Sequence, residues 1–110
     1  MPGLSDVVNF FLGNWDADID RLLDMSIADA HAELTQKANT LSSAQWVAFI
    51  TTIRARTGER GGEAAALAEI ADGLRKLTLN EPFRSRGPEQ VANGLRDLEY
   101  EKAQRKTKRS

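Results

Sequence analysis

Four features of the chain have residue types that catalytic or binding chemistry uses. The first is the alternating run Asp16, Asp18 and Asp20, which resembles the opening of a calcium-binding loop. Such a loop would need Gly where Arg21 stands and a bidentate Glu where Ile27 stands. Apolar residues also continue at helical spacing through the run. We therefore interpret it as the acidic, solvated face of a helix and expect no metal site there.

The second feature is His31, the only histidine in a chain without cysteine. A zinc site would lack nitrogen and sulfur ligands, and disulfides are excluded. A catalytic triad would need a hydroxyl and a carboxylate converging on this imidazole. The flanking Asp29 and Glu33 do not face it, because residues two apart on a helix point in different directions. We expect a surface or boundary histidine, and we predict no enzyme activity and no cofactor.

The third feature is the glycine-rich segment 58–62, Gly-Glu-Arg-Gly-Gly. A phosphate-binding P-loop would need Lys followed by Ser or Thr after its last glycine, whereas Glu63 follows here. A dinucleotide-binding fold would need a preceding strand, and the preceding residues have a helical pattern. We expect a hinge or a tight turn, near which Arg56 and Arg60 could help to hold an anion.

The fourth feature is the basic C-terminal end. Residues 1–40 have a charge balance of −5 and residues 81–110 one of +3, although the whole chain has a formal net charge of −1. Such asymmetry is typical of an end that binds a polyanion, of two ends that attract each other, or of a solvated tail. If phosphates bind, the residues that we assign to them are Arg84, Arg86, Arg96, Lys102, Arg105, Lys106, Lys108 and Arg109.

Helices must position these residues, because apolar residues recur three and four apart and no alternating strand pattern is present. We predict an all-α fold, a compact bundle of four to five helices packed around the third. The helices are expected at about 5–25 (with a kink at residues 13–14), 27–39, 43–57, 63–77 and 88–104.

The third predicted helix has the densest apolar stripe, formed by Trp46, Val47, Phe49, Ile50 and Ile53. We expect Ser43 to cap its start and Gly58 to close its end. Ser26 is expected to cap the second helix. Leu77 is expected in the core, Phe83 is expected to be tucked against the bundle, and Pro88 to stand in the first turn of the last helix.

The length of 110 residues favours one domain. We divide it into a helical-bundle domain, residues 1–101, and a basic, frayed tail, residues 102–110. No apolar run approaches the roughly 20 residues that span a bilayer, and the first residues lack the pattern of a signal peptide. We therefore expect a cytoplasmic protein with no membrane partner.

Two functions from different classes fit these observations. The first is a non-catalytic accessory subunit of a nucleic-acid-handling assembly, which docks on a protein and touches DNA or RNA phosphates without reading sequence. The second is a protein–protein interaction module (an inhibitor, antitoxin-like regulator, adaptor or homodimer) that uses an apolar helix face or the acidic first helix. The partner-binding residues in that case are Asp16, Asp18, Asp20 and Asp24.

Overall fold

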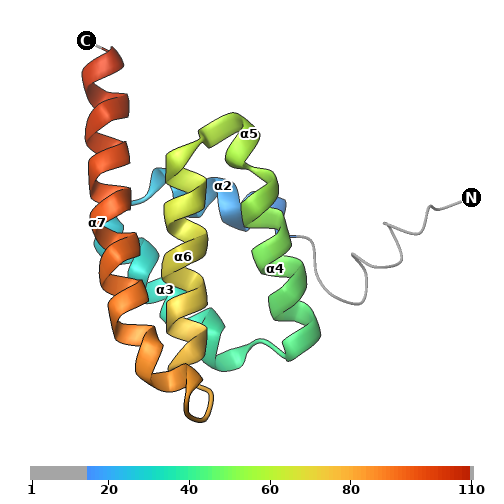
Figure 1. Ribbon diagram of the computed structural model, residues 1–110. Coiled ribbons are helices and arrows are strands. Elements are labelled where there is room, and N and C mark those ends of the chain that lie inside the picture. Colours follow the sequence, from blue (N-terminus) through green and yellow to red (C-terminus); the bar gives the residue numbers. More distant parts are fainter. Residues whose placement is uncertain (1–14, 110) are drawn as a thin grey trace, which may run out of the picture.

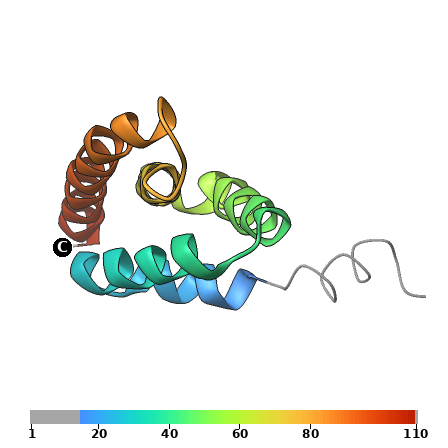
Figure 2. The same ribbon diagram turned by 90° about the horizontal axis from the view of Figure 1, so that it is seen from below.

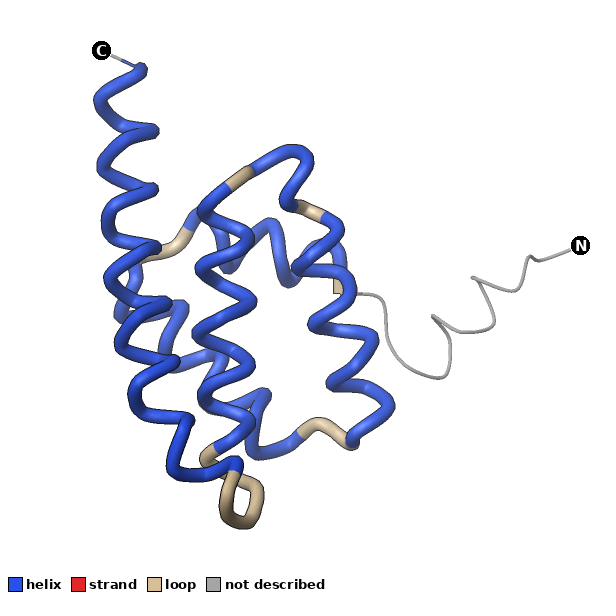
Figure 3. The backbone as a smooth tube through the Cα atoms, viewed as in Figure 1, coloured by secondary structure: helices blue, strands red, loops and turns tan. Residues whose placement is uncertain are grey.

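The computed structural model describes residues 15–109, with side chains described for residues 15–105. Over this range the chain is an all-α bundle, as the sequence predicts, and short loops join its helices (Figures 1 and 3). The predicted helix start at residue 5 and the kink at residues 13–14 lie outside the described residues. The helices in chain order are α2 Asp16–Asp24, α3 Ile27–Thr40, α4 Ser43–Ala55, the single-turn α5 Thr57–Arg60, α6 Gly62–Lys76 and α7 Phe83–Arg109.

Hydroxyl side chains begin α3 and α4. The Ser26 hydroxyl accepts a bond from the backbone N–H of Asp29 at 3.2 Å, which confirms the predicted cap of α3. The cap of α4 is Ser42, and the prediction of Ser43 is wrong. Gln45 stands three residues after Ser42, and its side-chain oxygen accepts from the Ser42 N–H at 3.0 Å while its own N–H donates to the Ser42 hydroxyl at 3.2 Å. This reciprocal pair of bonds is available only in the Ser42 register.

The glycine-rich segment forms a turn between two helices. Helix α4 ends at Ala55, the chain makes the single turn of α5, and Gly61 rather than Gly58 has the left-handed backbone, with φ of 54°. Glycine tolerates this conformation because it lacks a Cβ. The turn brings the start of α6 back against the bundle, so that residues 60–63 lie at a corner of the fold.

Helix α6, not the third predicted helix, is the centre of the bundle. In the view from below, α7, α3 with α2, and α4 surround it (Figure 2), and α6 contacts each of the other described helices. Its small residues explain this position, because Ala64, Ala66, Ala68 and Ala71 are all buried and leave room for neighbours on several sides. The large side chains of α4 cover one of those sides only.

The closest packing in the bundle is between α6 and α7. A Cβ at Gly94 of α7 would lie 2.8 Å from the backbone nitrogen of Ile70, and one at Gly73 of α6 would lie 2.7 Å from Val91 Cγ2. Only glycine fits such distances, since real Cβ atoms do not approach other atoms below 3.0 Å. Gly73, which looks like a flaw in a helix by propensity alone, is therefore a packing residue.

Three apolar residues lie further out than the sequence suggests. In the α4 stripe Trp46, Phe49, Ile50 and Ile53 are buried as predicted, but Val47 is 64% exposed. The other two corrections are at the turn between α6 and α7. Leu77, expected in the core, is 39% exposed, and Phe83, expected to be tucked against the bundle, is 52% exposed.

Helix α7 is longer than predicted at both ends. It begins at Phe83, so Pro88 lies inside it rather than in its first turn. It continues past the expected end near residue 104 to Arg109, and its last turns extend beyond the body of the bundle (Figure 1). Among the described residues no helix combines the length and the apolar character that crossing a membrane requires.

Candidate functional site

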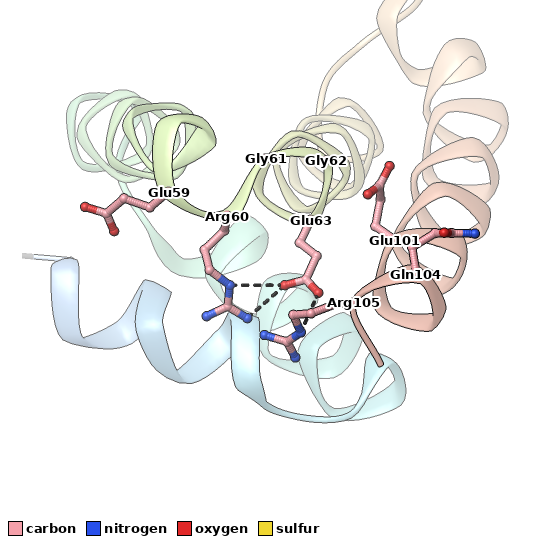
Figure 4. Close-up of a pocket in the computed structure, with 8 residues that line it drawn as sticks. All are labelled: Glu59, Arg60, Gly61, Gly62, Glu63, Glu101, Gln104 and Arg105. Atoms are coloured by element: carbon pink, nitrogen blue, oxygen red, sulfur yellow. Dashed lines mark hydrogen bonds and ion pairs between the residues drawn. The ribbon is translucent and has the colours of Figure 1, made fainter. Parts of the chain in front are cut away.

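A cluster of charged side chains lies where the start of α6 meets the last turns of α7. At its centre is Glu63 in the first turn of α6, whose side chain is only 4% exposed. Arg60 Nη2 lies 2.8 Å from Glu63 Oε2, and Arg105 Nε lies 3.0 Å from Glu63 Oε1. Figure 4 shows the two guanidinium groups reaching this carboxylate from α5 and α7. The Arg105 contact is an ion pair without hydrogen-bond alignment, because Oε1 accepts no hydrogen bond.

The same cluster joins α7 to the C-terminal end of α2. Lys102 Nζ donates to the backbone carbonyls of Leu23 at 2.8 Å and Met25 at 3.2 Å. These carbonyls lie at the negative end of the α2 dipole, which favours a cation. Burial nevertheless lowers the pKa of Lys102, and the nearby charge of Glu63 opposes that effect in part. The ammonium group of Lys102 is thus a structural contact between distant parts of the chain.

Arg60 completes the cluster from α5. Its Nη1 lies 3.2 Å from Asp24 Oδ1, and its Nη2 donates to the carbonyl of Leu23 at 3.3 Å. Desolvation acts to lower the pKa of Arg60, but hydrogen bonds and charge from Glu63 and Asp24 outweigh it and raise the pKa. Asp24 also lies 3.9 Å from Arg105, so the acidic and basic ends of the chain do attract each other within one molecule.

A shallow, open pocket of about 470 Å³ lies over this cluster. The residues lining it are Glu59, Arg60, Gly61, Gly62, Glu63, Glu101, Gln104 and Arg105 (Figure 4). They include no hydroxyl, thiol, imidazole or amine that could act as a nucleophile. Glu101 packs directly on Gly62, where a Cβ would collide with its carboxylate. The lining has three carboxylates and two guanidinium groups, so the pocket has one excess negative charge and does not favour an anionic ligand.

The predicted acidic face lies on α2, and its members have arginine partners. Arg56 contacts Asp16 Oδ1 at 3.2 Å and Asp20 Oδ1 at 2.7 Å, while Asp18 lies 3.1 Å from Arg21. Desolvation opposes the charged form of Arg56, but its hydrogen bond to Asp16 and the charges of its acidic neighbours raise its pKa. Asp16 and Asp20 therefore hold α2 against the α4–α5 junction, and a partner that bound the acidic face would compete with Arg56 and Arg21.

The eight basic residues assigned to phosphates do not form one patch. Arg84 and Arg86 lie in the first turns of α7, and Arg105 lies about 30 Å further along it, at 1.5 Å per residue. Arg84 Nε donates to the carbonyl of Leu79 at 3.2 Å, and Arg86 lines a second shallow pocket that also contains acids. Arg96 is exposed midway between these ends.

Lys102 and Arg105 point to the bundle, and the last turn of α7 carries the other three basic residues. Lys106, Lys108 and Arg109 belong to the helix by their backbone, and their side chains are outside the described part. The structure thus brings together Lys102 and Arg105 with Asp24 and Glu63. Sequence reasoning missed Glu63 as a site residue. The available signal was that Glu63 follows Arg60 by three residues. This spacing is typical of an ion pair between neighbouring side chains.

A second group of residues was missed at the opposite end of α7. Leu77, Leu79 and Phe83 are 39%, 40% and 52% exposed and lie close in sequence around the α6–α7 turn; we call them the apolar tip. Exposed side chains of this size are typical of protein-binding surfaces when they lie together. The sequence signal for this group was three large apolar residues within seven positions, at a place where the helical pattern of apolar residues ends.

The remaining candidates of the sequence lie on α2 and α3. His31 is partly buried in α3, which agrees with a boundary position. Among residues 15–105 no three acidic or histidine side chains lie close enough to hold a metal ion. Of the alternating aspartates, Asp16 and Asp20 share Arg56 as a partner, whereas Asp18 contacts Arg21.

Comparison with known proteins adds no assignment. No family model matches this chain, and neither a curated protein nor a solved structure matches it.

Proposed function

We propose that this protein is a non-catalytic accessory subunit of a nucleic-acid-handling assembly, whose phosphate contacts come from the last turn of α7. The observation that supports this most is the course of α7. It runs without a break to Arg109 and extends past the bundle, so the backbone of Lys106, Lys108 and Arg109 belongs to a projecting helix end. A helix C-terminus also favours cations, which keeps these residues compatible with the helix.

The proposed phosphate contacts involve only three of the eight basic residues that the sequence suggests. Lys102 and Arg105 have partners in α2 and α6, and Arg84 and Arg86 lie at the far end of α7. Phosphate binding by three cations releases counterions and does not require base contacts. The expected binding is therefore weak, independent of sequence and strongly dependent on salt.

Fluorescence anisotropy of a labelled 20-base-pair duplex tests this function. The full chain is titrated at 50 mM and 200 mM salt, beside a variant in which Lys106, Lys108 and Arg109 are all changed to Gln. We expect binding at low salt that the triple variant loses. A matched control changes Arg54, Arg84 and Arg86, which are exposed elsewhere, to Gln and is expected to bind as the unmodified chain does. Equal binding by all three proteins, or none at 50 mM salt, would reject the function.

The apolar tip supports a second candidate, a protein–protein interaction module. The apolar residues Leu77, Leu79 and Phe83 are exposed, and Arg84 and Arg86 follow them closely in the sequence. Aromatic and arginine side chains are enriched in binding hot spots. This surface and the last turn of α7 lie at opposite ends of the same helix. One molecule could therefore dock on a protein through one end and touch phosphates with the other.

Size-exclusion chromatography with light scattering, followed by affinity capture, tests the protein-binding candidate. A Phe83→Asp variant should lose a captured partner, or dissociate a homodimer, while a Val47→Asp variant serves as the control. Val47 is also an exposed apolar residue, but it lies on α4 and not at the α6–α7 turn. If both variants behave as the unmodified chain does, the tip is not the docking surface.

A further inference from the structure

Arg105 belongs to the basic end by sequence but to the bundle by its contacts. It is 37% exposed, its Nε lies 3.0 Å from the buried Glu63 carboxylate, and its Nη1 lies 3.9 Å from Asp24. It stands one residue before Lys106, the first cation of the projecting turn. It is therefore the group through which phosphate binding and the internal ion pairs would compete.

We infer that Glu63 is an internal competitor for phosphate, which withholds Arg105 from a bound polyanion. The inference rests on the proposed function and concerns the regulation of the same site. In the free protein Arg105 is paired with the Glu63 carboxylate, so at this end of α7 a duplex contacts the cations of the last turn and not Arg105. When the Glu63 charge is removed, Arg105 can contact one more phosphate of a polyanion that the last turn already holds, whereas an isolated phosphate ion lacks the other contacts that would hold it there.

Of the two arginines that contact Glu63, Arg105 is the less firmly held. Arg60 binds Glu63 through two nitrogens, at 2.8 and 3.2 Å, and is also held by Asp24 and the Leu23 carbonyl. Glu63 therefore keeps one cationic partner when Arg105 leaves, and its buried charge is not left unpaired. The Arg105 contact is a single ion pair without hydrogen-bond alignment, and its release costs correspondingly less.

A Glu63→Gln variant tests the inference, because the amide keeps the size of the side chain and removes its charge. The matched control is Glu33→Gln. Glu33 is also a carboxylate between two cations, with Arg21 at 2.8 Å and Lys37 at 3.9 Å, and neither of them is on α7. Both variants lose one negative charge, so any general effect of net charge on duplex binding is the same in the two.

We expect Glu63→Gln to bind the 20-base-pair duplex more tightly than Glu33→Gln does. The slope of log K against log salt should steepen by about 0.9, the value for one added phosphate contact. In the double variant Glu63→Gln with Arg105→Gln, the slope should return to that of the unmodified chain. With sodium phosphate in place of the duplex, at the same total phosphate concentration, Glu63→Gln should not bind more tightly than Glu33→Gln.

Circular dichroism shows whether Glu63→Gln remains helical. If it unfolds, the single variant Arg105→Gln provides a second measurement, in which the slope for duplex binding should equal that of the unmodified chain because Arg105 is withheld there. Equal slopes for Glu63→Gln and Glu33→Gln, or a shallower slope for Arg105→Gln than for the unmodified chain, overturn the inference while duplex binding persists. Absence of duplex binding in every protein instead rejects the proposed function, and the inference with it.

Discussion

Replacing Gly94 with Ala separates helix propensity from helix packing, because the two effects have opposite signs. Alanine favours a helix interior over glycine by about 1 kcal/mol. Against this, the new methyl group would lie 2.6 Å from Ile70 Cγ1, 2.8 Å from Ile70 N and 3.1 Å from the Ala66 carbonyl oxygen. Two of these three atoms are backbone, so α6 and α7 must move apart. Overpacking of this kind costs about 1–3 kcal/mol, and we expect the upper end of that range.

The net expectation for Gly94→Ala is a loss of about 1–2 kcal/mol in the free energy of unfolding. For a domain of this size that lowers Tm by about 4 °C per kcal/mol. Thermal and urea denaturation followed by circular dichroism measure both quantities. Gly58→Ala is the control, since no atom lies within 4 Å of the position its Cβ would take, and it should raise stability. A Gly94→Ala variant as stable as the unmodified chain would refute the close crossing of α6 and α7.

Three further outcomes are expected. Ser42→Ala should lower the free energy of unfolding by about 1 kcal/mol through loss of the α4 cap, whereas Ser43→Ala should change it little in the same urea titration; equal effects would contradict the observed cap. Burial lowers the pKa of Lys102 below its ordinary 10.5, so the folded state releases this proton first. The stability of the unmodified chain relative to Lys102→Met should therefore rise between pH 7 and pH 10, and a constant or falling difference would count against that direction. Phe83→Asp should leave Tm almost unchanged, because the ring is half exposed; a large loss of stability would mean that the ring is packed after all.

The sequence predicts which segments are helical because that information is local. The Ser26 cap and the spacing of Leu34, Phe49 and Leu67 along their helices place their buried faces correctly. Local patterns do not show which helix lies at the centre of the bundle. Alanine and glycine in α6 contribute little hydrophobic signal, yet their small size lets this helix contact all the others. The central position of α6 follows from the small volume of its side chains.

The candidate site was harder to predict than the fold, because its members come from distant parts of the chain. Charge patterning identified Lys102 and Arg105 as basic residues near one another, and it left open an attraction between the two ends. Whether these cations face solvent or the bundle depends on the phase of α7 against α6, which Gly94 and its contacts determine. Glu63 gave no strong signal because a single acidic residue at a helix start is common.

The dependence of duplex binding on salt is the most direct test of the central claim, that the last turn of α7 binds phosphates. With three contacting cations, log K should fall linearly with log salt with a slope of about −2.7 for the unmodified chain. The same slope should be obtained with duplexes of unrelated sequence. An affinity that does not change between 50 and 200 mM salt would contradict the account.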